Sequence, residues 1–258
     1  MEFASLQKHF GRMGARVAVT HRPGGFTVDV RRDPLGSLFD IAVNRATEQV
    51  MALDVQPRQR HLLLVVRHGA THKFLCGHDE RDWFAAAVPN AGGVSNVREA
   101  MEALKPREVH EAQIAKHVKR QHLNRRRNAG FVRQGEWFFV PVTGLVVKPL
   151  MIIQNEPLIR GRGKPHVAEF VSRTGGQMVY VSSEYPRGLS EKRYRRLLID
   201  DPSKAHLRWS FVRLNPEAYV RGTVRHPDHK TIRLDEWHRV FTNTENRAPA
   251  MRHLVFID

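Results

Sequence analysis

The sequence predicts a strand-rich α+β protein with two lobes joined by a basic surface helix. Three observations favour this class. Short segments rich in Val and Ile recur through the chain, few stretches have helical periodicity, and a long basic run separates the two halves. A chain of 258 residues can bury one large core or two smaller ones. We expect an N-terminal α+β lobe over residues 1–105, a basic helix and linker over 106–130, and a basic, β-rich lobe over 131–258.

The N-terminal lobe is predicted to consist mainly of short strands. They are expected at residues 16–20, 26–31, 38–43, 49–55, 61–67 and 83–88, with a short helix as the alternative for the alanine-containing segment 83–88. Turn residues such as Pro and Gly at positions 23–25 separate them. One helix is expected from Ser95, which can cap it, to Leu104, because Val97 and Ala100 fall on the same face as Leu104.

The next predicted helix, over residues 106–128, contains most of the basic run. Pro106 suits the first turn of a helix, and Ile114 and Val118 form a thin apolar stripe. Because nearly all of the remaining circumference is polar or basic, we expect this helix on the surface between the lobes.

The C-terminal lobe is predicted to return to strands. They are expected at residues 136–140, 151–154, 166–171, 177–182, 208–213, 218–224, 230–234, 237–241 and 253–257. One helix interrupts them, capped by Ser190 and ended by Pro202 after two aspartates.

The charge of the chain is concentrated in its second half. Residues 1–115 hold 15 Lys and Arg against 13 Asp and Glu, whereas residues 116–258 hold 27 against 13. The ratio of 32 Arg to 10 Lys is typical of a GC-rich genome. Such composition bias does not explain the uneven distribution. The positive field of this half attracts polyanions, of which nucleic acid is the most common. An acidic protein partner and a merely solvated basic surface are the alternatives.

We therefore predict a nucleic-acid-binding protein, DNA or RNA, that contacts the phosphate backbone through its basic half. Arg can grip phosphate with two parallel hydrogen bonds, and glycine-rich loops let backbone amides approach it. The candidate contact residues come from the carboxylate-free run 112–135 and from a glycine-rich loop further on: Lys116, Lys119, Arg120, Arg125, Arg126, Arg127, Arg133, Arg160, Arg162 and Lys164.

The C-terminal stretch has an Asp-His pair, an Asn fourteen residues on and a further His. This spacing of Asp228, His229, Asn243 and His253 resembles that of HNH-type nucleases. The resemblance implies that His229 activates water, that Asn243 ties the hairpin, and that Asp228 and His253 hold a divalent metal. A metal-dependent nuclease is thus the alternative function, and a metal cofactor is expected only with it.

Histidines are numerous in the same half of the chain, and strands can bring several imidazoles together. His166, His226, Asp228, His229, His238 and His253 are candidates for a transition-metal site of a more general kind. The alternative is that residues 227–229 simply form a turn between strands.

Residues 66–71 contain the run Arg-His-Gly-Ala-Thr after an apolar strand. The run is similar to the signature of histidine phosphatases. That resemblance implies that His68 is the phosphorylated residue and that Arg67 clamps the phosphate.

One cysteine, Cys76, excludes an intrachain disulfide and fits a reducing compartment. The strongly apolar stretch at residues 62–66 is too short to span a bilayer, and the first residues lack the pattern of a secretory signal. We expect a cytoplasmic protein that does not enter a membrane.

Overall fold

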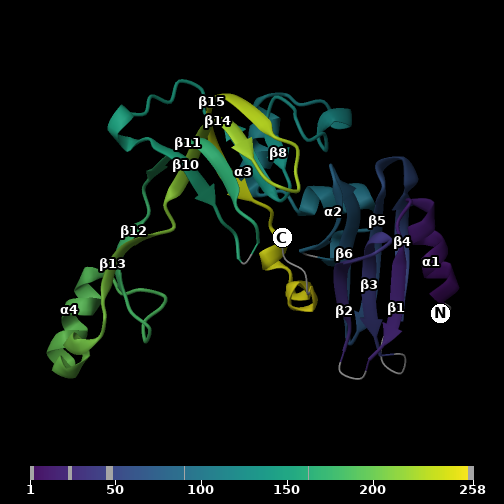
Figure 1. Ribbon diagram of the computed structural model, residues 1–258, viewed down its shortest axis with the longest axis horizontal. Coiled ribbons are helices and arrows are strands. Elements are labelled where there is room, and N and C mark those ends of the chain that lie inside the picture. Colours follow the sequence, from purple (N-terminus) through teal and green to yellow (C-terminus); the bar gives the residue numbers. More distant parts are fainter. Residues whose placement is uncertain (1–2, 23–24, 45–48, 90, 162, 255–258) are drawn as a thin grey trace.

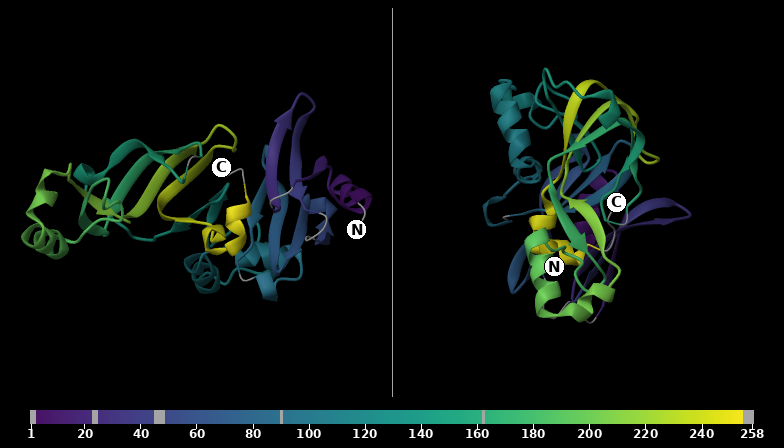
Figure 2. Two further views of the ribbon diagram at one scale, coloured as in Figure 1. Left: turned by 90° about the horizontal axis from the view of Figure 1, so that it is seen from below. Right: turned by 90° about the vertical axis from the view of Figure 1, so that its left-hand side faces the viewer.

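The computed structural model describes residues 3–22, 25–44, 49–89, 91–161 and 163–254. It is a mixed α+β structure, rich in strands, as predicted. Four sheets are distributed along the long axis, with α1 and α4 at opposite ends (Figures 1 and 2). Among the described residues, no helix combines the length and apolarity needed to cross a membrane.

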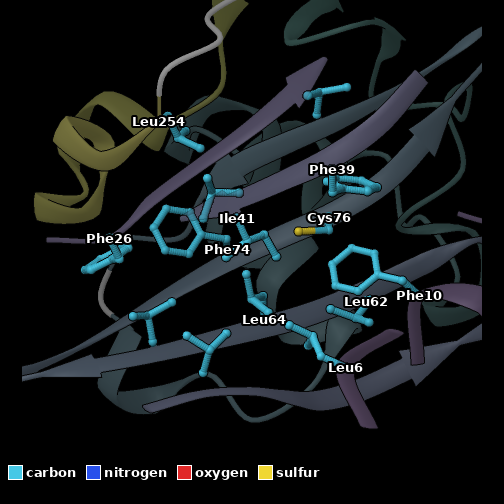
Figure 3. Close-up of a cluster of buried hydrophobic side chains, with 14 of the residues drawn as sticks. Leu6, Phe10, Phe26, Phe39, Ile41, Leu62, Leu64, Phe74, Cys76 and Leu254 are labelled. Atoms are coloured by element: carbon cyan, nitrogen blue, oxygen red, sulfur yellow. The ribbon is translucent and has the colours of Figure 1, made fainter. Parts of the chain in front are cut away.

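The first half of the chain forms two sheets that pack on one core. A three-stranded sheet has the order β1-β3-β2, and a four-stranded antiparallel sheet has the order β4-β5-β6-β7. The strands are β1 (Val17–His21), β2 (Thr27–Asp33), β3 (Gly36–Val43), β4 (Gln49–Gln56), β5 (His61–His68), β6 (Ala70–Asp79) and β7 (Asp82–Ala87). Figure 3 shows their shared core, where Phe39 and Ile41 face Leu62, Leu64 and Phe74.

Strand alternation gives β5 two apolar faces. Leu62 and Leu64 point into the core between the sheets, whereas Leu63 points to the outer face. Helix α2 (Val97–Ala103) covers that outer face with Val97 and Ala100. The helix was expected here, but its N-cap is Asn96 and not Ser95, because the Asn96 side chain accepts the bond from the Glu99 amide.

The predicted strands of this half are confirmed, and two elements were not predicted. Helix α1 (Phe3–Arg12) packs Leu6 and Phe10 into the core. Strand β6 has polar residues that do not resemble a central strand, yet it lies between β5 and β7. Its Lys73 is buried, and its ammonium donates a hydrogen bond to the Val94 carbonyl.

The second half is built on a six-stranded antiparallel sheet of order β10-β11-β14-β15-β9-β8. The strands are β8 (Val132–Gln134), β9 (Trp137–Pro141), β10 (Ile153–Leu158), β11 (His166–Thr174), β14 (Glu217–Arg225) and β15 (Ile232–Thr242). One face holds a core centred on Phe139, Val171 and Val220. The other face carries Phe131 and Phe138, which pack against Val109 of a short helix. The two segments predicted at 230–234 and 237–241 are thus one strand, β15.

The basic helix predicted over 106–128 is much shorter. Helix α3 spans Arg107–Ala115 and ends before the basic run. His117 has a φ of 49°, and the Val118 amide donates to the Gln113 carbonyl. These are the marks of a Schellman C-cap, in which a residue in the left-handed region closes the helix. The basic residues that follow therefore lie on an irregular loop with one 3-10 turn, Arg120–His122.

A small arm extends from the six-stranded sheet on the side away from α1 (Figures 1 and 2). It consists of β12 (Gln177–Val181), α4 (Glu191–Asp200) and β13 (Ser210–Leu214). Tyr180 and Tyr194 stack with ring centroids 3.9 Å apart, which joins the strand pair to the helix. Ser190 occupies the predicted N-cap position, but its side chain makes no capping hydrogen bond.

The C-terminal residues return to the first core. The 3-10 turns Glu245–Arg247 and Pro249–His253 lead to Leu254, which bridges to Val28 of β2. Residues 253–254 are thus not part of the strand expected at 253–257, and the remainder of that segment lies outside the described residues. The division at 105 and 130 stays a prediction, although Ala248, Ala250 and Leu254 share the N-terminal core.

Candidate functional site

Three buried histidines meet where strands β11 and β14 end. His166 is the first residue of β11, His226 follows the last residue of β14, and His229 lies in the connection to β15. Val167 pairs with Arg225, so the antiparallel register places His166 beside His226. The ring centroids of His166 and His226 are 4.2 Å apart, and those of His226 and His229 are 4.6 Å apart. One ligand nitrogen from each of the three lies within 4.8 Å of the other two.

The hairpin of β8 and β9 holds the loop that carries His226 and His229. The Gln134 amide is fully buried and donates to the Val224 carbonyl at 3.3 Å and to the Lys230 carbonyl at 2.8 Å. These two carbonyls are the ends of the loop. Gly135 follows with a φ of 57°, and a Cβ there would lie 2.6 Å from His229 Nε2. The close approach of this backbone to the ring requires glycine.

The three imidazoles differ in their hydrogen bonds. The Asp228 amide donates to His226 Nδ1 at 3.1 Å, and His226 Nε2 donates to the Lys164 carbonyl at 3.3 Å. Within the described part of the chain, neither ring nitrogen of His166 or His229 has a hydrogen-bond partner. His166 is 1% exposed and His229 is 7% exposed, so all four of these ring nitrogens are buried.

The surroundings keep these imidazoles neutral. Burial, with a smaller effect of the two neighbouring histidines, lowers the pKa of His166 to about 3. Burial also lowers the pKa of His226 and of His229. At neutral pH each ring therefore has a lone pair on one nitrogen.

Charged side chains surround one side of the cluster. Glu80 Oε2 lies 3.7 Å from His229 Nδ1, and its other oxygen is 3.1 Å from an Arg126 nitrogen. Lys164 pairs with Asp228 at 2.7 Å. His229, Asp228 and Lys164 line a cavity of about 330 Å³ that extends toward Trp83 of the first half.

The residues of the HNH resemblance do not converge on one ion. His253 stacks on Phe26 with ring centroids 3.9 Å apart and belongs to the 3-10 turn packed on the first core. Asn243 accepts a hydrogen bond from Arg160 at 2.7 Å. Asp228 is already paired with Lys164. The predicted metal ligands Asp228 and His253 are therefore separated, because the chain after β15 crosses to the other core instead of continuing as a helix beside His229.

The predicted phosphate-binding residues divide into two groups. Arg126 and Arg133 pair with Asp79, Arg160 pairs with Glu245, and Lys164 pairs with Asp228. Arg162 lies outside the described residues. The second group is exposed and has no carboxylate partner among the described residues, although Arg127 donates a hydrogen bond to the Arg233 carbonyl. It consists of Lys116, Lys119, Arg120, Arg125 and Arg127. We call these five residues, with the loop 116–127 that carries them, the basic segment.

Comparisons with protein-family models, with curated proteins and with solved structures found no match. The arrangement of side chains is therefore the basis for any functional argument.

The segment similar to the histidine phosphatase signature forms a hairpin. Strand β5 ends at His68, β6 begins at Ala70, and Gly69 between them has a φ of 65°. The two strands are antiparallel neighbours. This differs from the alternating α/β pattern that the resemblance implies. Arg67 is the next-to-last residue of β5 and is exposed, and the side chain of His68 lies outside the described part of the structure.

Sequence reasoning named the three clustered histidines among several candidates but did not separate them from His238 and His253. It did not identify Gln134, Glu80 or Asp79. The available signal was position, since His166 and His226 both adjoin predicted strand ends. Asp79 pairs with Arg126 and Arg133, about fifty residues away, whereas Glu80 also faces His229, about 150 residues away, so these partners are brought near only by folding.

Proposed function

We propose that the protein binds nucleic acid through the basic segment, and that it does so in the cytoplasm. One observation carries the proposal. Five cationic side chains within twelve residues are exposed and have no carboxylate partner in the described structure, in a run of chain free of Asp and Glu.

The ion pairs elsewhere make this segment distinct. A cation that already pairs with a carboxylate must lose that partner, or share it, before it can neutralise a phosphate. Arg126 is such a residue, since it contacts both Asp79 and Glu80. Lys119, Arg120 and Arg125 have no carboxylate partner to give up, so their charges attract a polyanion without that cost.

The irregular backbone of the segment suits the backbone of nucleic acid better than its base edges. A recognition helix in a major groove reads bases, but α3 ends at Ala115 before the cations begin. We therefore expect binding that depends on phosphates and salt and has little sequence preference. The nuclease alternative is not carried forward, because its metal ligands lie apart.

Binding of fluorescently labelled duplex DNA, single-stranded DNA and RNA, measured by anisotropy at several salt concentrations, tests the proposal. We expect the triple variant K119Q/R120Q/R125Q to flatten the log–log salt dependence on duplex DNA by about 2–3, at roughly 0.9 per phosphate contact. The matched control R16Q/R32Q/R195Q also removes three charges, each of which has a carboxylate partner.

Equal slopes for the two triple variants would overturn the assignment, because the effect would then follow net charge alone. No binding to any of the three nucleic acids at low salt would also overturn it. Binding to a polyglutamate peptide but not to nucleic acid would favour an acidic protein partner instead.

A further inference from the structure

Four buried ring nitrogens in the histidine cluster have no hydrogen-bond partner among the described residues. They are Nδ1 and Nε2 of His166 and of His229. An unpaired polar atom in the interior costs free energy, so buried polar groups are nearly always paired. Two neighbouring imidazoles with all four nitrogens unpaired point to a partner that is not a protein atom.

We propose that His166, His226 and His229 bind one divalent transition-metal ion, of which Zn²⁺ is the representative. The three residues offer one nitrogen each, and these nitrogens lie within 4.8 Å of one another. Neutral imidazole is a ligand for zinc, copper, nickel and iron, whereas magnesium and calcium prefer oxygen. The absence of a carboxylate from this group of three favours the first class.

The rings must move closer to bind one ion. Nitrogens at about 2.0–2.1 Å from a tetrahedral zinc ion lie roughly 3.3 Å apart. The three planes are now nearly parallel, inclined by 26° to 29°. Rotation about the side-chain torsions closes this difference while the backbone stays in place, because Gln134 holds both ends of the loop.

The contacts of the ring nitrogens that would not bind the ion are typical of a metal site. A metal-binding histidine usually donates its other ring N–H to a carbonyl or a carboxylate, which orients the ring. His226 Nε2 donates to the Lys164 carbonyl, so Nδ1 is its ligand atom. Binding of the metal at Nδ1 requires the Asp228 amide to give up its hydrogen bond to that nitrogen. His229 Nδ1 faces the Glu80 carboxylate at 3.7 Å, which leaves Nε2 as its ligand atom.

Three protein ligands leave a fourth position on a tetrahedral ion. Catalytic zinc sites have this composition, whereas structural sites use four protein ligands. His229 lines the cavity of about 330 Å³ together with Asp228 and Lys164. We therefore assign the fourth position to that side, where water or a small anion can enter.

The first experiment measures binding of Zn²⁺ and Co²⁺ to full-length protein freed of metal by a chelator. We expect about one Zn²⁺ per chain by calorimetry, and Co²⁺ absorption bands of a nitrogen and oxygen site without thiolate charge transfer. Cys76 is buried in the other core and cannot contribute sulfur. H166F and H229N should each weaken Zn²⁺ binding at least about tenfold.

The matched control is H238Q. His238 is buried like the three ligands and lies in the same sheet, but its Nδ1 is bonded to the Glu236 carbonyl and it is outside the cluster. Its replacement should leave the affinity for Zn²⁺ within about twofold. If H166F bound Zn²⁺ as tightly as wild type, the proposal would be overturned. The same holds if H238Q lost stoichiometric Zn²⁺ binding to the same extent as H166F.

A second measurement, the melting temperature with and without Zn²⁺, distinguishes loss of the metal site from loss of the fold. Zn²⁺ at about 100-fold above its Kd should raise the melting temperature of wild type and H238Q by roughly 5 °C or more. The metal-free H166F protein should melt no lower than metal-free wild type, since phenylalanine removes two unpaired nitrogens from the interior. A Zn²⁺-dependent rise in H166F equal to that of wild type would refute the site.

Azide tests the open position. We expect it to change the Co²⁺ spectrum of the wild type, and an unchanged spectrum would show that the fourth position is closed. None of these measurements involves nucleic acid, so their failure leaves the basic segment untouched. Nucleic-acid binding by metal-free protein likewise tests the segment without the site.

Discussion

Arg126 forms an ion pair with Asp79 at the end of β6, while Arg125 beside it in sequence is exposed and has no carboxylate partner in the described structure. Arg126 also contacts Glu80, whose carboxylate faces His229. Two neighbouring arginines therefore have different roles. One connects the halves of the chain, and the other is available to an external anion.

Replacing these two arginines should have unequal effects on stability. We expect Arg126→Gln to lower the free energy of unfolding by about 1–2 kcal/mol, because Asp79 and Glu80 are nearly buried and keep fewer partners. Arg125→Gln should change it by less than about 0.5 kcal/mol. Urea denaturation of the two variants measures the difference, and equal stabilities would show that the ion pair contributes nothing.

The same two variants should differ in the reverse sense in nucleic-acid binding. Arg125→Gln should reduce the salt slope on duplex DNA by about 0.9, the share of one phosphate contact. Arg126→Gln should reduce it by much less, since its charge is already neutralised by two carboxylates. Anisotropy titrations at several salt concentrations measure both slopes, and a larger effect of Arg126→Gln would contradict our division of the basic residues.

Gly135→Ala should destabilise the protein more than Gly144→Ala. Both glycines have positive φ, at 57° and 78°, so alanine is strained at each. At position 135 the added methyl group also meets His229 Nε2 at 2.6 Å, whereas at position 144 nothing lies within 4 Å. We expect a cost of about 1 kcal/mol for Gly144→Ala and about 2–3 kcal/mol for Gly135→Ala. Similar midpoints in urea would show that the loop around His229 moves freely.

Acid should destabilise the fold through His61. Burial lowers the pKa of His61 to about 4, whereas in the unfolded chain an imidazole titrates near 6.5. Between these values the unfolded chain takes up a proton and the folded chain does not. The contribution is therefore complete above about pH 6.5 and is lost as the pH falls toward 4, by up to about 3 kcal/mol.

The variant His61→Gln should lose less stability over this pH range than wild type. His117→Asn is the control, because His117 is exposed and asparagine tolerates its positive φ. The measurement is the free energy of unfolding at a series of pH values between about 6.5 and 4. Parallel curves for wild type and His61→Gln would exclude His61 as the cause.

The thiol of Cys76 should react only when the protein unfolds. The side chain is fully buried in the first core, and burial raises the pKa of the thiol far above its usual range. We expect Ellman's reagent to label it slowly in the native state, with a rate that rises with urea as the unfolded population does. Rapid labelling in buffer alone would show that β6 opens locally.

Local pattern predicted most strands, because the period of two and the β-branched residues are properties of short segments. The strands β2, β3 and β5 were predictable on this ground. Strand β6 was not, since its polar residues are satisfied by partners such as the Val94 carbonyl that lie elsewhere in the chain. The end of α3 was missed because one histidine, His117, adopts the left-handed conformation that usually marks glycine.

The sequence by itself determined the class of fold, the uneven charge and the residues that can carry chemistry. The tertiary structure decided which of those residues meet. It placed His166 beside His226 and His229 through the strand register, and it moved His253 to the other core. It also paired Arg126 with Asp79 and left Arg125 exposed. The physical reason is that propensity is a property of a few neighbouring residues and total charge depends on composition alone, whereas coordination and ion pairing depend on distances that only the packed chain establishes.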